Sequence, residues 1–81
     1  ATDQLGEIEA IKKFLPACTE TKQTKQLYQL CPETEIELRE KILYQWVVLS
    51  NNFADIREVK PLTKSDSEAG KLAYQKYLKF F

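Results

Sequence analysis

The sequence predicts an all-α fold, a small three- to four-helix bundle in which residues 1–81 form a single helical domain. Apolar side chains recur at the three- and four-residue spacing of one helix face in successive segments. The chain contains only two glycines, and no segment shows the strict apolar and polar alternation of a half-buried strand. A chain of 81 residues buries a modest core, so most of its large apolar side chains are needed there.

The first predicted helix covers about residues 3 to 15. Thr2 or Asp3 can cap its start, because their side-chain oxygens accept hydrogen bonds from free backbone N–H groups. Pro16 ends the helix, because proline lacks a backbone donor and clashes with the preceding turn. The apolar half of its helical wheel contains Leu5, Ile8, Ile11, Phe14 and Leu15.

The second segment begins without apolar side chains, because residues 19–26 read TETKQTKQ. Only its second half can face a core, through Leu27, Tyr28, Leu30 and Cys31. Since tertiary packing of an apolar face supplies most helix stability in proteins, the first half of this segment is a candidate loop.

This segment separates the only two cysteines, Cys18 and Cys31, which could form a disulfide, half a metal site, a reactive pair or two buried apolar positions. If residues 19–31 form one helix, a rise of about 1.5 Å per residue separates the α-carbons by roughly 19 Å, whereas a disulfide tolerates about 7 Å. If the polar half is a loop, Cys18 can fold back and reach Cys31. We expect Cys31 to be buried beside Leu30. Cys18 would become reactive only beside a cation or a helix N-terminus.

The third segment carries the strongest helix signal. Thr34 and Glu37 have capping-box spacing, and Pro61 limits the helix because the residue before proline avoids helical angles. Asn51 and Asn52 fall on the polar half of the wheel and leave the apolar stripe uninterrupted. We therefore predict one long helix from about residue 35 to about residue 58. The stripe contains Ile36, Leu38, Ile42, Leu43, Trp46, Val47, Leu49, Phe53 and Ile56.

Two side chains on this stripe have distinct expected roles. Trp46 lies at its centre and is expected to anchor the core. Arg39 is the one cation on the apolar half, where it can extend to solvent, pair with an acid or bind an anionic ligand. The first two of these roles are the commoner ones.

The fourth predicted helix runs from about residue 66 to the C-terminus. Ser65 and Glu68 form a second capping-box pattern, and Asp66 and Glu68 stand where the helix dipole favours anions. The apolar half of its wheel is wider than one neighbouring helix needs. It contains Ala69, Ala73, Tyr74, Tyr77, Leu78, Phe80 and Phe81.

A lone tryptophan in one helix followed by a tyrosine in a later helix, here Trp46 and Tyr77, resembles the WY-type helical domain of secreted oomycete effectors. The resemblance rests on these two residues and on the aromatic C-terminal end, and it covers residues 36–81 at most. It implies a helical fold, and we take no function from it.

The residue types present argue against catalytic and metal chemistry. The chain contains no histidine, which excludes catalytic triads, Cys–His pairs and histidine-containing zinc sites. The spacing of the two cysteines matches no short zinc knuckle, so we expect no metal and no cofactor. The acids at the predicted helix starts are expected to be solvated caps rather than catalytic pairs. They include Glu33, Glu35, Glu37 and Glu40.

The charge balance argues against nucleic acid and against a membrane as partners. Twelve basic and twelve acidic residues give a net charge of zero and a pI of about 6.5, so no long-range field attracts polyanions. The longest apolar run, from Trp46 to Leu49, is far shorter than the roughly 20 residues that span a bilayer, and no signal segment opens the chain. We expect a soluble chain without a transmembrane segment. Because it begins at Ala1 and lacks methionine, we expect a processed or excised chain, and its compartment stays open, secretion included.

These observations favour a non-catalytic helical protein–protein interaction module or a small subunit of a complex. The first alternative is a processed or secreted carrier of an apolar ligand, or a secreted effector-like protein; the second is a thiol-dependent enzyme or redox protein built on Cys18. Aromatic side chains beside lysines at a chain end are suited to a partner with an apolar groove and an acidic rim, or to self-association. The candidate partner-binding residues are Tyr74, Tyr77, Phe80, Phe81, Lys76 and Lys79.

Overall fold

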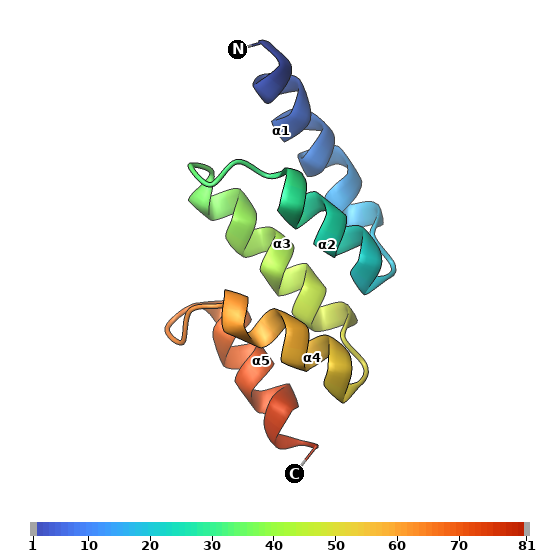
Figure 1. The fold of residues 1–81 in the computed structure, drawn as a ribbon, viewed down its shortest axis with the longest axis vertical. Helices are drawn as coiled ribbons and strands as arrows, with labels where there is room; N and C mark the ends of the chain where they lie inside the picture. The colour runs from blue at the N-terminus through green and yellow to red at the C-terminus, as the bar shows by residue number, and fades with distance from the viewer. Residues whose placement is uncertain (1, 81) are drawn as a thin grey trace.

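The computed structural model describes residues 2–80, with the side chains of residues 6–80. This part of the chain contains five α-helices, two short 3-10 helices and no strand (Figure 1). The all-α class is confirmed, whereas the expected number of three to four helices is too small. In chain order the elements are α1 (Thr2–Phe14), η1 (Leu15–Ala17), α2 (Thr21–Leu30), α3 (Ile36–Leu49), α4 (Phe53–Val59), η2 (Lys60–Leu62) and α5 (Glu68–Leu78).

The helices form an elongated, flat molecule whose α-carbons extend over 46 × 24 × 16 Å. α3 lies in the middle, with α1 and α2 toward one end and α4 and α5 toward the other (Figure 1). Packed helix axes lie about 8–10 Å apart, so the shortest dimension accommodates two helix layers. Neighbouring helices therefore cover α3 only in part, and some of its surface faces solvent.

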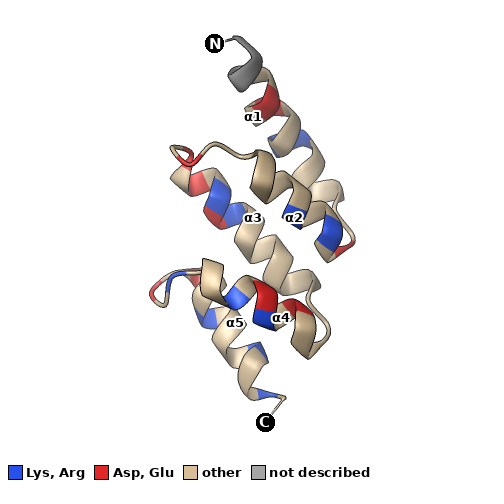
Figure 2. Ribbon diagram, viewed as in Figure 1, with Lys and Arg blue, Asp and Glu red and all other residues tan. Residues whose placement is uncertain are grey.

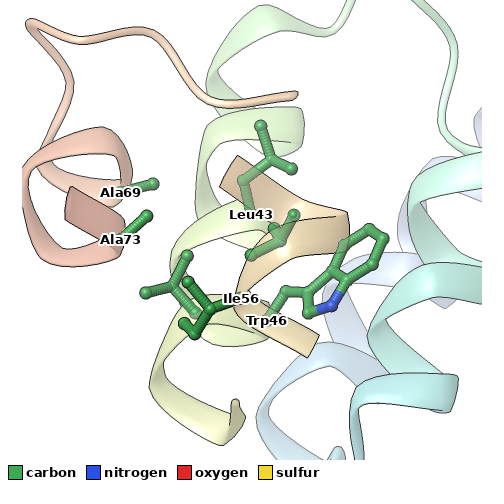
Figure 3. Close-up of a cluster of buried hydrophobic side chains, with 7 residues drawn as sticks. Leu43, Trp46, Ile56, Ala69 and Ala73 are labelled. Atoms are coloured by element: carbon green, nitrogen blue, oxygen red, sulfur yellow. The ribbon is translucent and has the colours of Figure 1, made fainter. Parts of the chain in front are cut away.

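Two clusters of buried apolar side chains meet on α3. Tyr28 of α2 packs against both clusters. In the cluster between α3, α4 and α5, Figure 3 shows Ala69 and Ala73 of α5 directed toward the other buried side chains. Trp46 is 2% exposed, which confirms its expected place in the core. The first cluster contains Ile8, Ile11, Cys31, Leu38 and Ile42. The second contains Leu43, Trp46, Val47, Ile56, Val59, Ala69 and Ala73.

The polar second segment is helical, so the expectation of a loop in its first half is wrong. α2 begins at Thr21, and the Gln23 side-chain oxygen accepts hydrogen bonds from the backbone N–H groups of Thr19 at 2.7 Å and Glu20 at 3.1 Å. Thr24 is fully buried, and its hydroxyl donates to the Thr21 carbonyl at 2.8 Å. Local capping and one buried threonine thus replace the apolar face that the first half lacks.

The single long helix expected from residue 35 to residue 58 is divided into α3 and α4. Asn52 caps α4, because its side-chain oxygen accepts a hydrogen bond from the Asp55 backbone N–H at 2.9 Å. Asparagine at this position favours a new helix start over continuation of the old one. The predicted Thr34 and Glu37 capping box is also absent: Glu35 is the N-cap residue of α3, without a side-chain capping bond.

α5 begins two residues later than predicted. Its N-cap is Ser67, whose hydroxyl accepts from the Gly70 backbone N–H at 3.0 Å, so the box at Ser65 and Glu68 does not form. Gly70 allows the turn to lie directly on the helix, because a Cβ there would stand 1.8 Å from the Lys64 carbonyl oxygen. For α1, the predicted caps Thr2 and Asp3 lie outside the described side chains.

Candidate interaction surface

Aromatic side chains from the start of α4 and the end of α5 gather at one end of the molecule. The Phe53 ring stacks on Tyr77, with centroids 5.6 Å apart, and meets Phe80 edge to face at 5.9 Å. Tyr74 is 56% exposed, Leu78 50% and Phe80 45%. Tyr74 stands three residues before Tyr77 and four residues before Leu78, and side chains at these spacings are neighbours on a helix. We name Phe53, Tyr74, Tyr77, Leu78 and Phe80 the C-terminal aromatic surface.

Cations border this surface. The Lys60 ammonium lies 5.1 Å from the centroid of the Tyr77 ring, within the range of a cation–π interaction. Lys71 and Lys79 are exposed, and Figure 2 shows basic residues along α5 toward the C-terminus. Residues 69–81 contain three lysines and no acid, so this end of the molecule presents apolar rings beside positive charge.

Two of the predicted partner-binding residues, Phe81 and Lys76, are not assigned to this surface. Phe81 lies outside the described residues. The Lys76 ammonium turns into the protein and donates to the carbonyl oxygens of Val47 at 2.8 Å, Val48 at 3.0 Å and Ser50 at 3.1 Å. These carbonyl groups lie at the C-terminal end of α3, where the Val47 carbonyl also accepts from the Ser50 backbone N–H at 3.1 Å, so Lys76 caps that helix.

The environment of Lys76 also affects its protonation. Burial lowers the pKa of the Lys76 ammonium from its ordinary value, and the neighbouring charge of Lys79 lowers it further. The three carbonyl oxygens hold the ammonium in place despite this cost of desolvation. Sequence reasoning could not find this role, because the acceptors lie 26 to 29 residues earlier in the chain.

Arg39 of α3 contacts Tyr28 of α2 and the backbone that follows α2. Its guanidinium carbon lies 4.4 Å from the centroid of the Tyr28 ring, and Nη2 donates to the Tyr28 hydroxyl at 2.7 Å. Nη1 donates to the Cys31 carbonyl at 3.4 Å. Arg39 therefore contacts the same tyrosine through its charge, its planar face and a hydrogen bond, a combination that arginine provides and lysine does not.

Both cysteines are free and buried, as expected for Cys31. The Cys18 thiol donates to the Phe14 carbonyl at 3.5 Å, and the Cys31 thiol to the Pro32 carbonyl at 3.7 Å. Burial raises the pKa of both thiols, and the charge of Arg39 offsets part of the effect at Cys31. A nucleophilic cysteine requires a lowered pKa. Within residues 6–80 no three Cys, Asp or Glu side chains are grouped as metal ligands.

A second surface feature lies on α3, in a position that sequence reasoning did not single out. A hollow of about 550 Å³ is floored by Glu40, Lys41, Tyr44 and Gln45 of α3. Its walls are Leu15 and Pro16 from η1 and Glu68 and Ala69 from α5. We name this hollow the α3 groove. The sequence signal for it is Tyr44, an aromatic side chain on the polar half of the wheel.

Comparisons with known proteins assign no family to the chain. No family model matches it, and neither a curated protein nor a solved structure matches it. In the described part of the chain, no helix combines the length and the apolar character that crossing a membrane requires. The basis for a functional proposal is therefore the geometry of the surface.

Proposed function

We propose that this protein is a non-catalytic helical module that binds a protein partner through the C-terminal aromatic surface. The observation that carries the proposal is the contact of Phe53 with Tyr77 and Phe80, together with the exposed side chains of Tyr74 and Leu78 on the same helix. Single exposed apolar residues are normal on protein surfaces, whereas contiguous ones mark interaction sites. Tyrosine is also enriched among the residues that dominate binding energy in interfaces.

The charge around this surface narrows the kind of partner. The charged residues that line the two hollows beside Tyr74 and Tyr77 are Arg57, Lys60 and Lys71, and Lys79 is exposed nearby. Rim charges of one sign favour a partner of the opposite sign and accelerate its association. A partner with apolar side chains and an acidic rim fits this arrangement.

The two alternatives receive less support from the geometry. A thiol-dependent enzyme needs an activated cysteine, whereas burial raises the pKa of both thiols. A carrier of an apolar ligand needs an internal space between its helices. Here the buried side chains between the helices pack against one another in the two clusters, and the α3 groove lies on the surface.

Affinity capture with matched variants tests this proposal. The surface variant Tyr74→Ser/Phe80→Ser removes two exposed rings, and Phe14→Ser removes a ring that is 57% exposed on α1. We expect captured proteins to be lost with the surface variant and kept with Phe14→Ser, while circular dichroism shows both variants folded. If the same proteins bind all three forms equally, the C-terminal aromatic surface is not the binding site.

A further inference from the structure

We propose that the partner of this protein is a second copy of the chain, with the outer face of α5, which shares Tyr74 and Leu78 with the C-terminal aromatic surface, lying in the α3 groove of the neighbouring copy. The outer face of α5 is defined by Lys71, Tyr74, Gln75 and Leu78, all exposed. This inference rests on the proposed function and names the partner that the function leaves open.

The α3 groove has the two properties that the aromatic surface requires of a partner. Its apolar parts are the Leu15 and Pro16 wall and the Tyr44 ring, which is 44% exposed. Its rim carries the carboxylates of Glu40 and Glu68, neither of which has an ion-pair partner within residues 6–80. The groove is therefore apolar inside and carries two acids against one base, Lys41.

The outer face of α5 has the complementary pattern. Its residues are spaced as i, i+3, i+4 and i+7, the spacing by which an amphipathic helix presents anchors to a groove. Tyr74 and Leu78 supply the apolar anchors, and Lys71 and Lys79 supply cations that can face Glu40 and Glu68 of the neighbour. Exposed pairs of this kind set orientation and association rate more than affinity.

Nothing in the overall charge opposes contact between two copies. The net charge is zero, so no long-range repulsion separates identical molecules. Lys41 and Tyr44 are exposed on this side of α3, so no other helix within residues 6–80 covers them. A helix from a second copy would add the missing neighbour.

The groove and the outer face use different parts of the α5 surface, although Glu68 of the groove stands three residues before Lys71 of the outer face. Ala69, on the groove side, and Leu78, on the outer face, are nine residues apart, which corresponds to about two and a half helical turns. One copy can therefore offer its outer face to one neighbour and its groove to another. Such a contact is head to tail and does not close within a pair, so it produces rings or open chains of copies.

Sedimentation velocity with three double variants tests this arrangement. The groove variant is Glu40→Lys/Tyr44→Ser, and the face variant is Lys71→Glu/Tyr74→Ser. The control, Glu9→Lys/Phe14→Ser, makes the same kinds of change on exposed positions of α1. Circular dichroism establishes that each variant is folded before it is compared.

We expect the wild type and the control to form species larger than dimers as concentration rises, and added salt to weaken them because the ion pairs are exposed. The groove variant and the face variant, each measured alone, should be monomeric at concentrations at which the wild type assembles, because each change weakens association at least 10-fold. An equimolar mixture of the two should form a heterodimer and stop there, because it contains one intact groove and one intact face.

Three results would overturn the inference: a wild type that is monomeric at about 1 mM, a dimer as the largest species, or a mixture that stays monomeric. If the wild type is monomeric but another protein binds it through Tyr74 and Phe80, the proposed function stands and the inference about a second copy is wrong. If the wild type assembles but neither the face variant nor Tyr74→Ser/Phe80→Ser affects any association, both proposals are wrong.

Discussion

The same substitution, glycine to alanine, should have opposite effects at the two glycines of this chain. In helices, alanine is favoured over glycine by about 0.8–1 kcal/mol, because glycine loses more backbone entropy on folding. At Gly6 of α1 a new Cβ would meet no atom within 4 Å, so that gain is available. At Gly70 of α5 the Cβ would lie 1.8 Å from the Lys64 carbonyl oxygen and 2.7 Å from its carbon.

The overlap at Gly70 involves backbone, so the turn from Lys64 to Ser67 has to move. Overpacking of this kind costs about 1–3 kcal/mol, and displacing Ser67 removes a helix cap that contributes about 1 kcal/mol. After subtracting the propensity gain, we expect Gly70→Ala to destabilise the fold by about 2 kcal/mol. For a chain of this size, that corresponds to a fall of roughly 8–16 °C in Tm. Gly6→Ala should raise the unfolding free energy by up to about 1 kcal/mol.

Urea unfolding measures both effects in the same protein, because the buried Trp46 reports the loss of the second cluster by its fluorescence. Far-ultraviolet circular dichroism provides a second probe, and coincident transitions justify comparing the free energies. A Gly70→Ala variant as stable as the wild type would show that the turn from Lys64 to Ser67 does not pack on α5. The reasoning would also be refuted if the two alanine variants shifted stability in the same direction.

Three further predictions concern ionisable side chains. Lys76→Met should lower the unfolding free energy by about 1.5 kcal/mol, the lower end of the range for hydrogen bonds to charged groups, because burial opposes the ammonium. Lys79→Met should change the unfolding free energy little, and equal urea midpoints for the two variants would contradict the capping role. Cys31 should be alkylated more slowly than Cys18, which lines a surface hollow. Mass spectrometry of the native protein during alkylation measures both rates, and equal rates would contradict this prediction. Because burial raises the pKa of the Cys31 thiol above 9.0, its contribution to stability is complete below pH 9.0 and is lost as the pH rises through the raised value. The stability difference between wild type and Cys31→Ala, measured by urea unfolding, should therefore shrink at alkaline pH, and a constant difference would argue against the shift.

The helical class and many core positions followed from apolar periodicity, because the spacing that places side chains on one face also favours their burial. Trp46 and Ile42 are examples, at 2% and 0% exposure. Ile36 and Phe53 of the predicted stripe are nevertheless exposed, at 60% and 37%, as are Phe14 and Leu30.

Helix boundaries were harder to predict. Asn52 lies on the polar half of the wheel whether it continues a helix or caps a new one, so periodicity alone cannot distinguish the two. Ser65 and Ser67 are both candidates for the N-cap position of α5 within one short turn. The packing of that turn against Gly70 is consistent only with Ser67 as the N-cap residue.

The candidate site was predicted in part for a similar reason. The aromatic side chains of α5 were found because they lie on one helix, and their neighbour Phe53 was assigned only to the core. Lys76 was placed among the surface cations, since its acceptors at the end of α3 are distant in sequence. The α3 groove depends on how η1 and α5 approach α3 from opposite ends of the chain, and no local pattern encodes that approach.

The meeting of two apolar clusters on α3 has a consequence for cooperativity. Each cluster draws on a different half of the chain, and α3 is the helix that contributes to both. Beyond α3, links between the halves within residues 6–80 include the Tyr28 ring and the ion pair of Lys25 with Glu58, whose side chains are half exposed. Such exposed ion pairs add little stability. Loss of α1 and α2 from their cluster would leave the contacts of α3 with α4 and α5 in place. The molecule can therefore open from its N-terminal end in a sub-global step, with a smaller free energy than complete unfolding.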